Sequence, residues 1–429
     1  MEPIIEIQSN DITIKVERSL LAGIVQHHQT RWEVEEHLNE LSALAKTAGA
    51  EVVDTVIQER NSPDPAYFLG KGKIEEIALR VEMDSVNLII FDDELSPAQV
   101  RNLEKALSVK VIDRTALILD IFALHARSSE AKTQVELAQL NYLLPRLTRQ
   151  WQHLSRQVGG IGTKGPGETQ LETDRRLIRT RIARLKQDLK RIEKQNSTQR
   201  VQRESVFRAA LIGYTNAGKS TLMNALTDAE VLVEDQLFAT LDTTIRRLQL
   251  NSGTTLLLSD TVGFIRKLPH QLVASFKTTL AETTGADLLV HVVDISHPHF
   301  SDHIEVVNNL FTELKISQKE RLLVFNKVDQ IKQNGILNQI KARYPEAIFV
   351  SGKRGIGIQN LKDRLGEIVE SGFETEQIRL NFHSGSAEYL IRPLARVLEK
   401  TFDDEYIYLT IKYPRENKSK IDAVTSQYK

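Results

Sequence analysis

The chain has 429 residues, of which 41% are hydrophobic and 26% charged, so an ordinary soluble protein with more than one domain is expected. The absence of cysteine excludes disulfides and thiolate metal sites and is typical of the reducing cytoplasm. The first six residues lack a signal-peptide pattern, and no uncharged apolar run is long enough for a membrane span.

Residues 1–143 alternate short apolar runs with helical patterns. The runs 52–57 and 86–91 predict buried strands, and the run 109–112 predicts a third strand. A helix is predicted over 74–81, and another is opened by Ser96 and Pro97. Strands that alternate with helices indicate a small α/β domain with a parallel sheet.

Residues 144–204 predict a basic helical hairpin with a glycine-rich loop. One helix is expected from Glu130 to about residue 158 and a second from about 169 to 203, separated by five glycines within residues 159–167. Residues 145–208 contain sixteen Lys or Arg but six Asp or Glu. We interpret this excess as an RNA-binding surface rather than a solvated helix face.

The RNA-binding candidates in this region are Lys164, Arg175, Arg176, Arg179, Arg184 and Arg191. Apolar residues of the second helix recur at helical spacing and are expected to pack between the paired helices: Leu171, Ile178, Ile182, Leu185, Leu189 and Ile192.

Residues 205–371 begin with an apolar strand pattern at 206–212, followed by G-x-x-x-x-G-K-S at 213–220 and a helical pattern. Strand, loop and helix in this order predict a phosphate-binding loop whose amides face the phosphates. Lys219 is expected to reach the β and γ phosphates, and the Ser220 hydroxyl to bind Mg²⁺. The expected contacts are Gly213, Tyr214, Thr215, Asn216, Ala217, Gly218, Lys219, Ser220 and Thr221.

Three further motifs follow in the order that a guanine-nucleotide site requires. Asp260, Thr261, Val262 and Gly263 form D-x-x-G, in which Asp260 would hold Mg²⁺ through water and Gly263 would sense the γ-phosphate. In Asn326, Lys327, Val328 and Asp329, the last carboxylate can accept hydrogen bonds from guanine, whereas adenine would leave it unpaired. Backbone amides of Ser351, Gly352 and Lys353 would contact the guanine oxygen.

A switch threonine is also needed for Mg²⁺, and Thr240, Thr243 and Thr244 are all candidates from the residues alone. Residues 372–429 predict a small α+β domain with a strand at 406–411. The last dozen residues are polar and are expected to be poorly anchored.

The segment 159–176, G-G-I-G-T-K-G-P-G-E-T-Q-L-E-T-D-R-R, closely resembles the signature of the HflX family of ribosome-associated GTPases. F-A-T-L-D at 238–242, D-T-V-G-F-I-R-K-L-P at 260–269, F-L-G-K-G-K at 68–73 and the pair Asp113-Arg114 also resemble it. Two departures from the common pattern are mild: Asp242-Thr243-Thr244 replaces Asp followed by Pro or Ala, and S-G-K replaces S-A-K.

The resemblance implies an N-terminal domain with a helical hairpin, a P-loop GTPase domain with a doubly wound, mostly parallel sheet, and activity on ribosomes. It assigns the Mg²⁺ ligand to Thr240 and adds the nucleotide contacts Phe238, Ala239, Thr240, Leu241 and Asp242. Lys219, Thr240 and Gly263 are then the catalytic candidates.

Hydrolysis is expected to be slow without a partner, because Phe264 stands where Ras-like GTPases place a water-orienting glutamine shortly after D-x-x-G. The ribosome is our expected activator. Asn216 has two readings: a K⁺ ligand that supplies positive charge, or a loop residue bonded to its own backbone.

The sequence therefore predicts a monomeric, cytoplasmic, Mg²⁺-dependent GTPase that binds GTP and GDP and hydrolyses GTP to GDP and phosphate, with K⁺ as a candidate second cation. Its expected partner is the large ribosomal subunit with its rRNA, and its expected action is the splitting of stalled or idle ribosomes. The alternative is a GTP-switched RNA- or ribosome-binding regulator of assembly or hibernation with incidental turnover. The guanine motif at 326–329 disfavours an ATP-driven helicase.

Overall fold

The computed structural model describes residues 16–27, 29–147, 166–201, 206–227, 237–238, 240–250, 254–267, 281–331, 334–381, 389–403 and 405–427. The chain forms two compact units: one contains residues 1–193, 233–242 and 262–280, and the other 194–232, 243–261 and 281–429. Two short segments near the nucleotide motifs therefore belong to the N-terminal unit. Across the described ranges, no helix is both long and apolar enough to cross a membrane.

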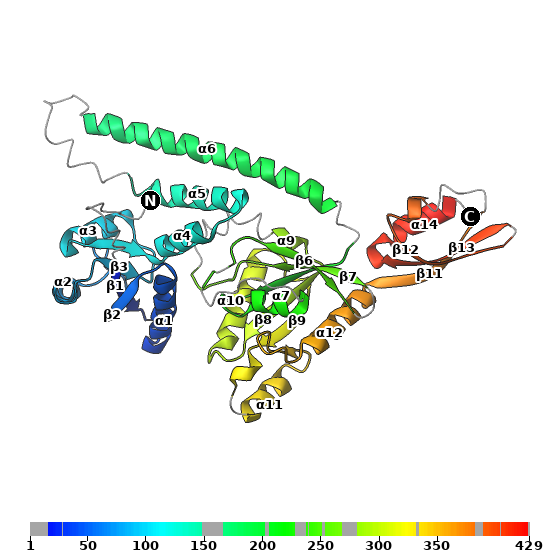
Figure 1. Ribbon diagram of the computed structural model, residues 1–429. Helices are drawn as coiled ribbons and strands as arrows, with labels where there is room; N and C mark the ends of the chain where they lie inside the picture. The colour runs from blue at the N-terminus through cyan, green and yellow to red at the C-terminus, as the bar shows by residue number, and fades with distance from the viewer. Residues whose placement is uncertain are drawn as a thin grey trace, which may run out of the picture. The chain divides into compact units, whose positions relative to one another are not determined.

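A four-stranded parallel sheet organises the N-terminal unit (Figure 1). Its strand order is β2-β1-β3-β4, with β1 at Arg18–Val25, β2 at Glu51–Glu59, β3 at Leu88–Phe91 and β4 at Lys110–Asp113. Helices α2 (Lys71–Met83) and α3 (Pro97–Leu107) pack on one face. Helices α1 (Arg31–Thr47) and α4 (Arg114–His125) lie on the other. The predicted parallel α/β domain is confirmed.

Two details of this sheet differ from the sequence prediction. Strand β2 forms an edge, and Val56 is its buried residue, so the prediction of a buried strand at 52–57 is wrong. The interior strand β1, buried from Ser19 to Ile24, lies outside the predicted runs. An apolar run indicates burial, but neighbours in space decide which strand lies at the centre.

Helix α5 covers Ser129–Leu143, and α6 covers Pro166–Val201 beside it (Figure 1). The predicted packing role is confirmed for Ile178, Ile182, Leu185 and Leu189 of α6, which form a small core with α5; Ile192 is not part of that core, and the Leu171 side chain lies outside the described residues. The buried members of the core are Leu137, Ile182 and Leu185, with Leu140, Leu144, Ile178 and Leu189 packed around them.

The prediction that the first helix continues from Glu130 to about residue 158 is wrong at residues 144–147, which form a turn. Pro145 has no amide hydrogen to donate to the preceding helical turn, so the helix ends before it. Residues 148–165, with most of the predicted glycine-rich segment and Lys164, lie outside the described residues.

The second unit contains a six-stranded sheet in the order β10-β9-β8-β5-β7-β6. The strands are β5 (Arg208–Gly213), β6 (Thr244–Gln249), β7 (Thr255–Asp260), β8 (Leu288–Asp294), β9 (Glu320–Asn326) and β10 (Ile348–Phe349). Only β6 pairs antiparallel among these strands. The doubly wound, mostly parallel sheet of a P-loop GTPase domain is therefore confirmed.

Helices cover both faces of this sheet. One core includes α7 (Lys219–Thr227) and α12 (Ile358–Ser371), and a second includes α10 (Phe300–Glu313) and α11 (Asn334–Arg343). Short helices α9 (Ala281–Gly285) and η1 (Val328–Gln330) connect elements at the edges.

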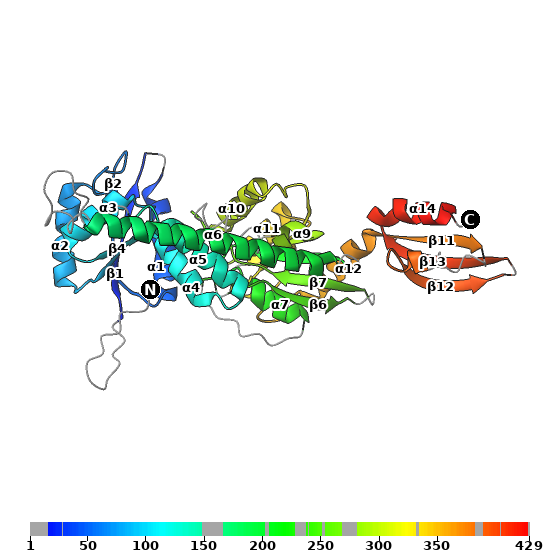
Figure 2. The same cartoon turned by 90° about the horizontal axis from the view of Figure 1, so that it is seen from above.

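The C-terminal part of the unit is a three-stranded antiparallel sheet covered by a helix (Figure 2). Strands β11 (Phe373–Asn381), β12 (Arg396–Phe402) and β13 (Tyr406–Pro414) precede η2 (Arg415–Asn417) and α14 (Lys418–Gln427). The small α+β fold is confirmed. The expectation of a poorly anchored end is wrong, because Ile421 is buried and Val424 packs on the same core one turn further along the helix.

The α5–α6 core generates a stability prediction. Replacing Leu185, which is 2% exposed, by alanine should lower the free energy of unfolding by about 2–5 kcal/mol, because a cavity replaces buried methyl groups. Leu177 on the same helix is 61% exposed, so Leu177→Ala is the matched control and should change stability little. Urea unfolding of both variants measures the difference; equal losses would contradict the packing role.

Candidate nucleotide site

The loop that follows β5 has backbone conformations that demand glycine. Gly218 has a φ of +85°, and a Cβ there would lie 2.4 Å from the Asn326 side-chain nitrogen. A Cβ on Gly213 would lie 2.1 Å from the carbonyl oxygen of Val292. The loop therefore turns sharply against β8 and β9 before α7 begins at Lys219. Its amides and the helix N-terminus lie at the carboxyl edge of the sheet.

Lys219 is buried and folds back over the loop. Its Nζ donates to the carbonyl oxygens of Gly213 and Tyr214, at 3.2 and 2.9 Å. Burial lowers the pKa of Lys219 to about 8, although nearby Asp260 opposes this shift. A phosphate anion would supply the counter-charge that this ammonium group lacks.

Ser220 and Asp260 meet at the ends of α7 and β7. The Ser220 hydroxyl donates to Asp260 Oδ2 at 2.6 Å, and Asp260 is buried. A hydroxyl and a carboxylate are the hard oxygen donors that Mg²⁺ prefers. These two residues therefore fit the predicted ion, which would supply positive charge to the phosphates.

Asn326 connects three loops of the site. Its Nδ2 donates to the carbonyl oxygens of Ala217 and Gly218, at 2.9 and 3.4 Å. Its Oδ1 accepts from the backbone amides of Lys327 and Gly352, at 2.8 and 3.0 Å. One buried amide thus joins the phosphate loop to both segments expected to hold the base.

Asp329 lies in η1, with a side chain 10% exposed and Arg354 Nε 3.5 Å from Oδ2. Ser351 is fully buried, and its hydroxyl accepts from the Arg354 amide. The residues predicted to select guanine are therefore gathered at one edge with the phosphate loop. Lys327 has a left-handed backbone, with φ at 64°, and its chain runs close to Gly218.

Asp294 and His303 also contact predicted site residues at this edge, although the sequence did not predict them. The Lys327 ammonium pairs with Asp294 at 2.7 Å, and Asp294 lies opposite Asn326 in the β8–β9 register. The Tyr214 ring stacks on His303 of α10, with centroids 3.8 Å apart. An aspartate at the end of a buried parallel strand is a signal that could have identified Asp294, whereas the stacked pair depends on tertiary packing.

The contacts predicted at 238–242 and at Val262 and Gly263 do not belong to this unit. Phe238, Thr240, Leu241, Asp242, Val262 and Gly263 lie in the N-terminal unit, and Ala239 is outside the described residues. The Asp242 carboxylate accepts from the backbone amides of Arg127 and Ser128, at 2.9 and 3.0 Å. In this structure Asp242 therefore contacts the start of α5.

The sheet, the phosphate loop and the guanine-type motif define the class of protein: a P-loop GTPase. Three family models match, described as the N-terminal part of a GTP-binding GTPase at 35–123, its middle region at 125–203 and a 50S ribosome-binding GTPase at 208–327. The GTPase HflX of Caldanaerobacter subterraneus is 46% identical over 94% of this chain and 93% of its own. That of Flavobacterium psychrophilum is 55% identical over 75% and 77%, respectively. The chain belongs to the HflX family of GTPases.

A solved structure also overlays on the chain. It is a GTP-binding protein from the archaeon Sulfolobus solfataricus in complex with GDP, with 24% identity and a TM-score of 0.43. The match covers 82% of this chain and 99% of the other.

The depressed pKa of Lys219 predicts proton uptake on binding. Near pH 8.5 the Lys219 side chain of the nucleotide-free protein is mostly an uncharged amine. Because a bound triphosphate would raise the pKa of Lys219, the side chain would take up a proton on binding. GTP affinity should therefore fall as pH rises above about 8. Titration calorimetry at pH 8.5 in buffers of different ionisation enthalpy measures the uptake. Lys219→Arg, which stays charged, should abolish it. Equal buffer dependence in both proteins would contradict the prediction.

Asp329 generates a specificity prediction. Asp329→Asn replaces one acceptor by an amide donor, so GTP affinity should fall by about 100-fold or more while xanthosine triphosphate, with a carbonyl at position 2, should bind better. Competition against a fluorescent nucleotide measures both affinities. The control Asp363→Asn changes an exposed acid of α12 and should leave them unchanged. An equal fall in affinity for GTP and xanthosine triphosphate would mean that the substitution disturbs the site as a whole and does not change base recognition.

Proposed function

We propose that this GTPase acts on ribosomes: it binds the large subunit and its rRNA and couples GTP hydrolysis to the separation of stalled or idle ribosomes. The carrying observation is the charge of α6. Residues 172–195 hold nine Lys or Arg and four Asp or Glu, while the apolar stripe of the helix faces α5. A helix that is apolar on one side and basic elsewhere suits phosphate contact without loss of its own packing.

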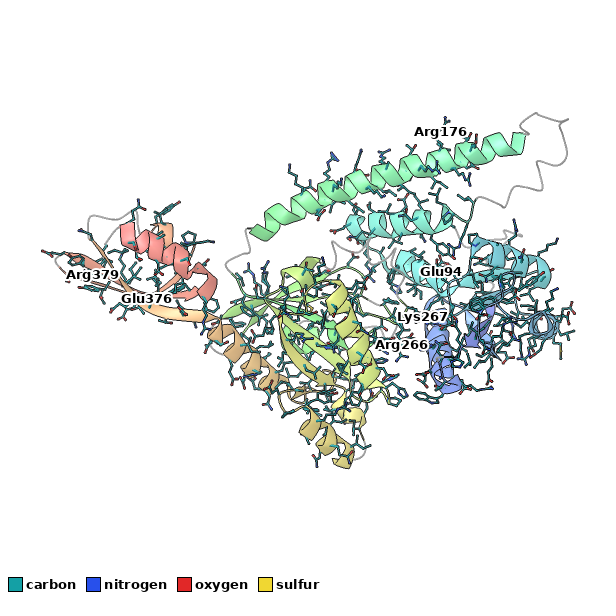
Figure 3. All side chains as sticks on the ribbon, turned by 180° about the vertical axis from the view of Figure 1, so that it is seen from behind. Glu94, Arg176, Arg266, Lys267, Glu376 and Arg379 are labelled. Atoms are coloured by element: carbon teal, nitrogen blue, oxygen red, sulfur yellow. The ribbon has the colours of Figure 1, made fainter. Side chains whose placement is uncertain are left out.

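The predicted RNA contacts are distributed along this helix. Arg176, Arg179, Arg184 and Arg191 are exposed, and Arg175 is half-buried (Figure 3 labels Arg176). Arg181, by contrast, pairs with Glu136 of α5 at 2.6 Å and serves the hairpin itself. The family model that matches residues 208–327 describes a 50S ribosome-binding GTPase, which supports a ribosomal target.

In the proposed reaction, Lys219 and the loop amides would hold the phosphates, and Ser220, Thr240 and Asp260 are the residues that would hold Mg²⁺, Asp260 through water. Asn326, Asp329 and the amides at 351–353 select guanine. Phe264 is buried and its side chain cannot orient water, which supports a need for ribosomal activation. A K⁺ site at Asn216 stays a prediction; that residue is exposed with φ at 58°, in keeping with either reading.

The second candidate function is a GTP-switched regulator that binds RNA or ribosomes, with incidental turnover. The same basic helix supports this function, so the two candidates are distinguished by whether the protein separates ribosomal subunits and whether ribosomes stimulate its GTP hydrolysis. The cytoplasmic location, the monomeric state and the domain boundaries at 143/144, 204/205 and 371/372 also stay predictions.

The test is sucrose-gradient sedimentation of ribosomes with protein plus GDP, GTP or a non-hydrolysable analogue. We expect binding to the large subunit, separation of subunits with GTP or the analogue, and at least about tenfold stimulation of turnover by ribosomes.

Arg184→Glu with Arg191→Glu should weaken binding and reduce its salt dependence. Arg364→Glu, an exposed change on α12, is the control. Binding without splitting or stimulation would favour the regulator.

A further inference from the structure

Lys327 carries its ammonium group on a long side chain that runs close to the phosphate loop. Its backbone is left-handed, with φ at 64°, a conformation that residues with a Cβ rarely adopt. A Cβ placed on Gly218 would lie 3.9 Å from Lys327 Cε, so the methylene stem lies against the loop. A lysine side chain loses much rotamer freedom when it is held in one such position. A partner at its far end is therefore needed to hold it there.

Asp294 is that partner. Its Oδ2 lies 2.7 Å from Lys327 Nζ, and the side chains of Asp294 and Lys327 are 17% and 21% exposed. Ion pairs on an open surface contribute little, because water and salt screen them and both side chains lose freedom. This pair is mostly shielded from water, so its attraction is screened less. It is therefore able to hold the lysine side chain in one rotamer.

The Asp294 carboxylate is fixed independently of the lysine. Its Oδ1 accepts from the Ser296 amide and hydroxyl, at 2.9 and 2.5 Å. Asp294 ends β8 in register with Asn326 of β9, and the next amide, that of Ile295, donates to the Asn326 carbonyl at 3.1 Å. Both the backbone and one carboxylate oxygen are thus held in place, while the other oxygen binds the ammonium group. Little further ordering is needed when Lys327 pairs with it.

The segment that follows Asp294 is also fixed, and it contacts the phosphate loop. Helix α10, which begins at Phe300, packs beside β8 and β5, and Phe300 lies against the core that contains Val293 (Figure 1). In the same helix, the His303 ring stacks in parallel on the ring of Tyr214, with an interplanar angle of 4°. The start of this helix and the end of β8 therefore contact both the phosphate loop and the base-recognition segment.

We propose that Asp294 is a positioning residue that acts through Lys327 and slows the release of guanine nucleotides. The proposal rests on the proposed role of residues 326–329 in binding the base, where the extended lysine stem offers an apolar surface to the purine ring. Without Asp294 the stem samples other rotamers, and the base loses that surface. Because GDP and GTP carry the same base, Asp294 slows the release of both nucleotides equally.

The experiment measures, without ribosomes, the dissociation rates of fluorescent GDP and of a fluorescent, non-hydrolysable GTP analogue from the full chain by stopped-flow displacement. Asp294→Asn keeps the shape of the side chain and removes its charge, so it should raise both rates about fivefold, the scale of one shielded ion pair. Glu305→Gln makes the same change of charge at an exposed acid of α10 and is the matched control, for which both rates should stay unchanged.

A double-mutant cycle distinguishes positioning through Lys327 from a general loss of structure. Lys327→Met keeps an unbranched side chain but lacks the ammonium group, so it should raise both rates as Asp294→Asn does. Adding Asp294→Asn to Lys327→Met should then have no further effect, whereas independent structural defects would multiply.

Unchanged rates in either single variant, or rates that multiply in the double variant, would overturn the proposal. Failure of the proposed action on ribosomes looks different. Ribosomes would then stay unsplit in the sucrose gradients, while the dissociation rates of the wild-type chain and of the Asp294 and Lys327 variants would still differ as expected.

Discussion

The side chain of Asn326 makes the contacts on which the nucleotide edge depends. It donates to the carbonyls of the phosphate loop and accepts from amides of the two base-recognition segments. Its position is set by β9, which places it in register with Asp294 of β8. A buried amide left without these partners would cost free energy, so each of the three loops stabilises the arrangement of the others.

The two units use the same property of parallel sheets for different purposes. In the second unit, the strand ends gather Gly213, Asp260, Asp294 and Asn326 into a nucleotide edge. In the N-terminal unit, the end of β3 provides Asp92 and Asp93, which bind Lys267. The carboxyl edge of a parallel sheet concentrates backbone amides and polar side chains. Such an edge suits a nucleotide in the second unit and the Lys267 ammonium group in the N-terminal unit.

Buried charge is costly unless it is paired, and the N-terminal unit pairs it in networks. Asp113 is fully buried and accepts from the Leu95 and Ala116 amides, the Tyr142 hydroxyl and Arg146. Beside it in sequence, Arg114 joins Asp92 to Glu40. These contacts attach α4 and α5 to the sheet, and Arg114 and Lys267 both pair with Asp92.

The sequence by itself determined the order of the nucleotide motifs, the P-loop fold and the family, because these depend on short segments whose residues are neighbours in the chain. It also identified the packing stripe of α6, whose period is local. Only the tertiary structure decided that β1 is an interior strand, that α14 is anchored through Ile421, and that Lys267 pairs with Asp92 and Asp93. Those contacts join residues as far as 175 positions apart, and local pattern carries no information about such pairs.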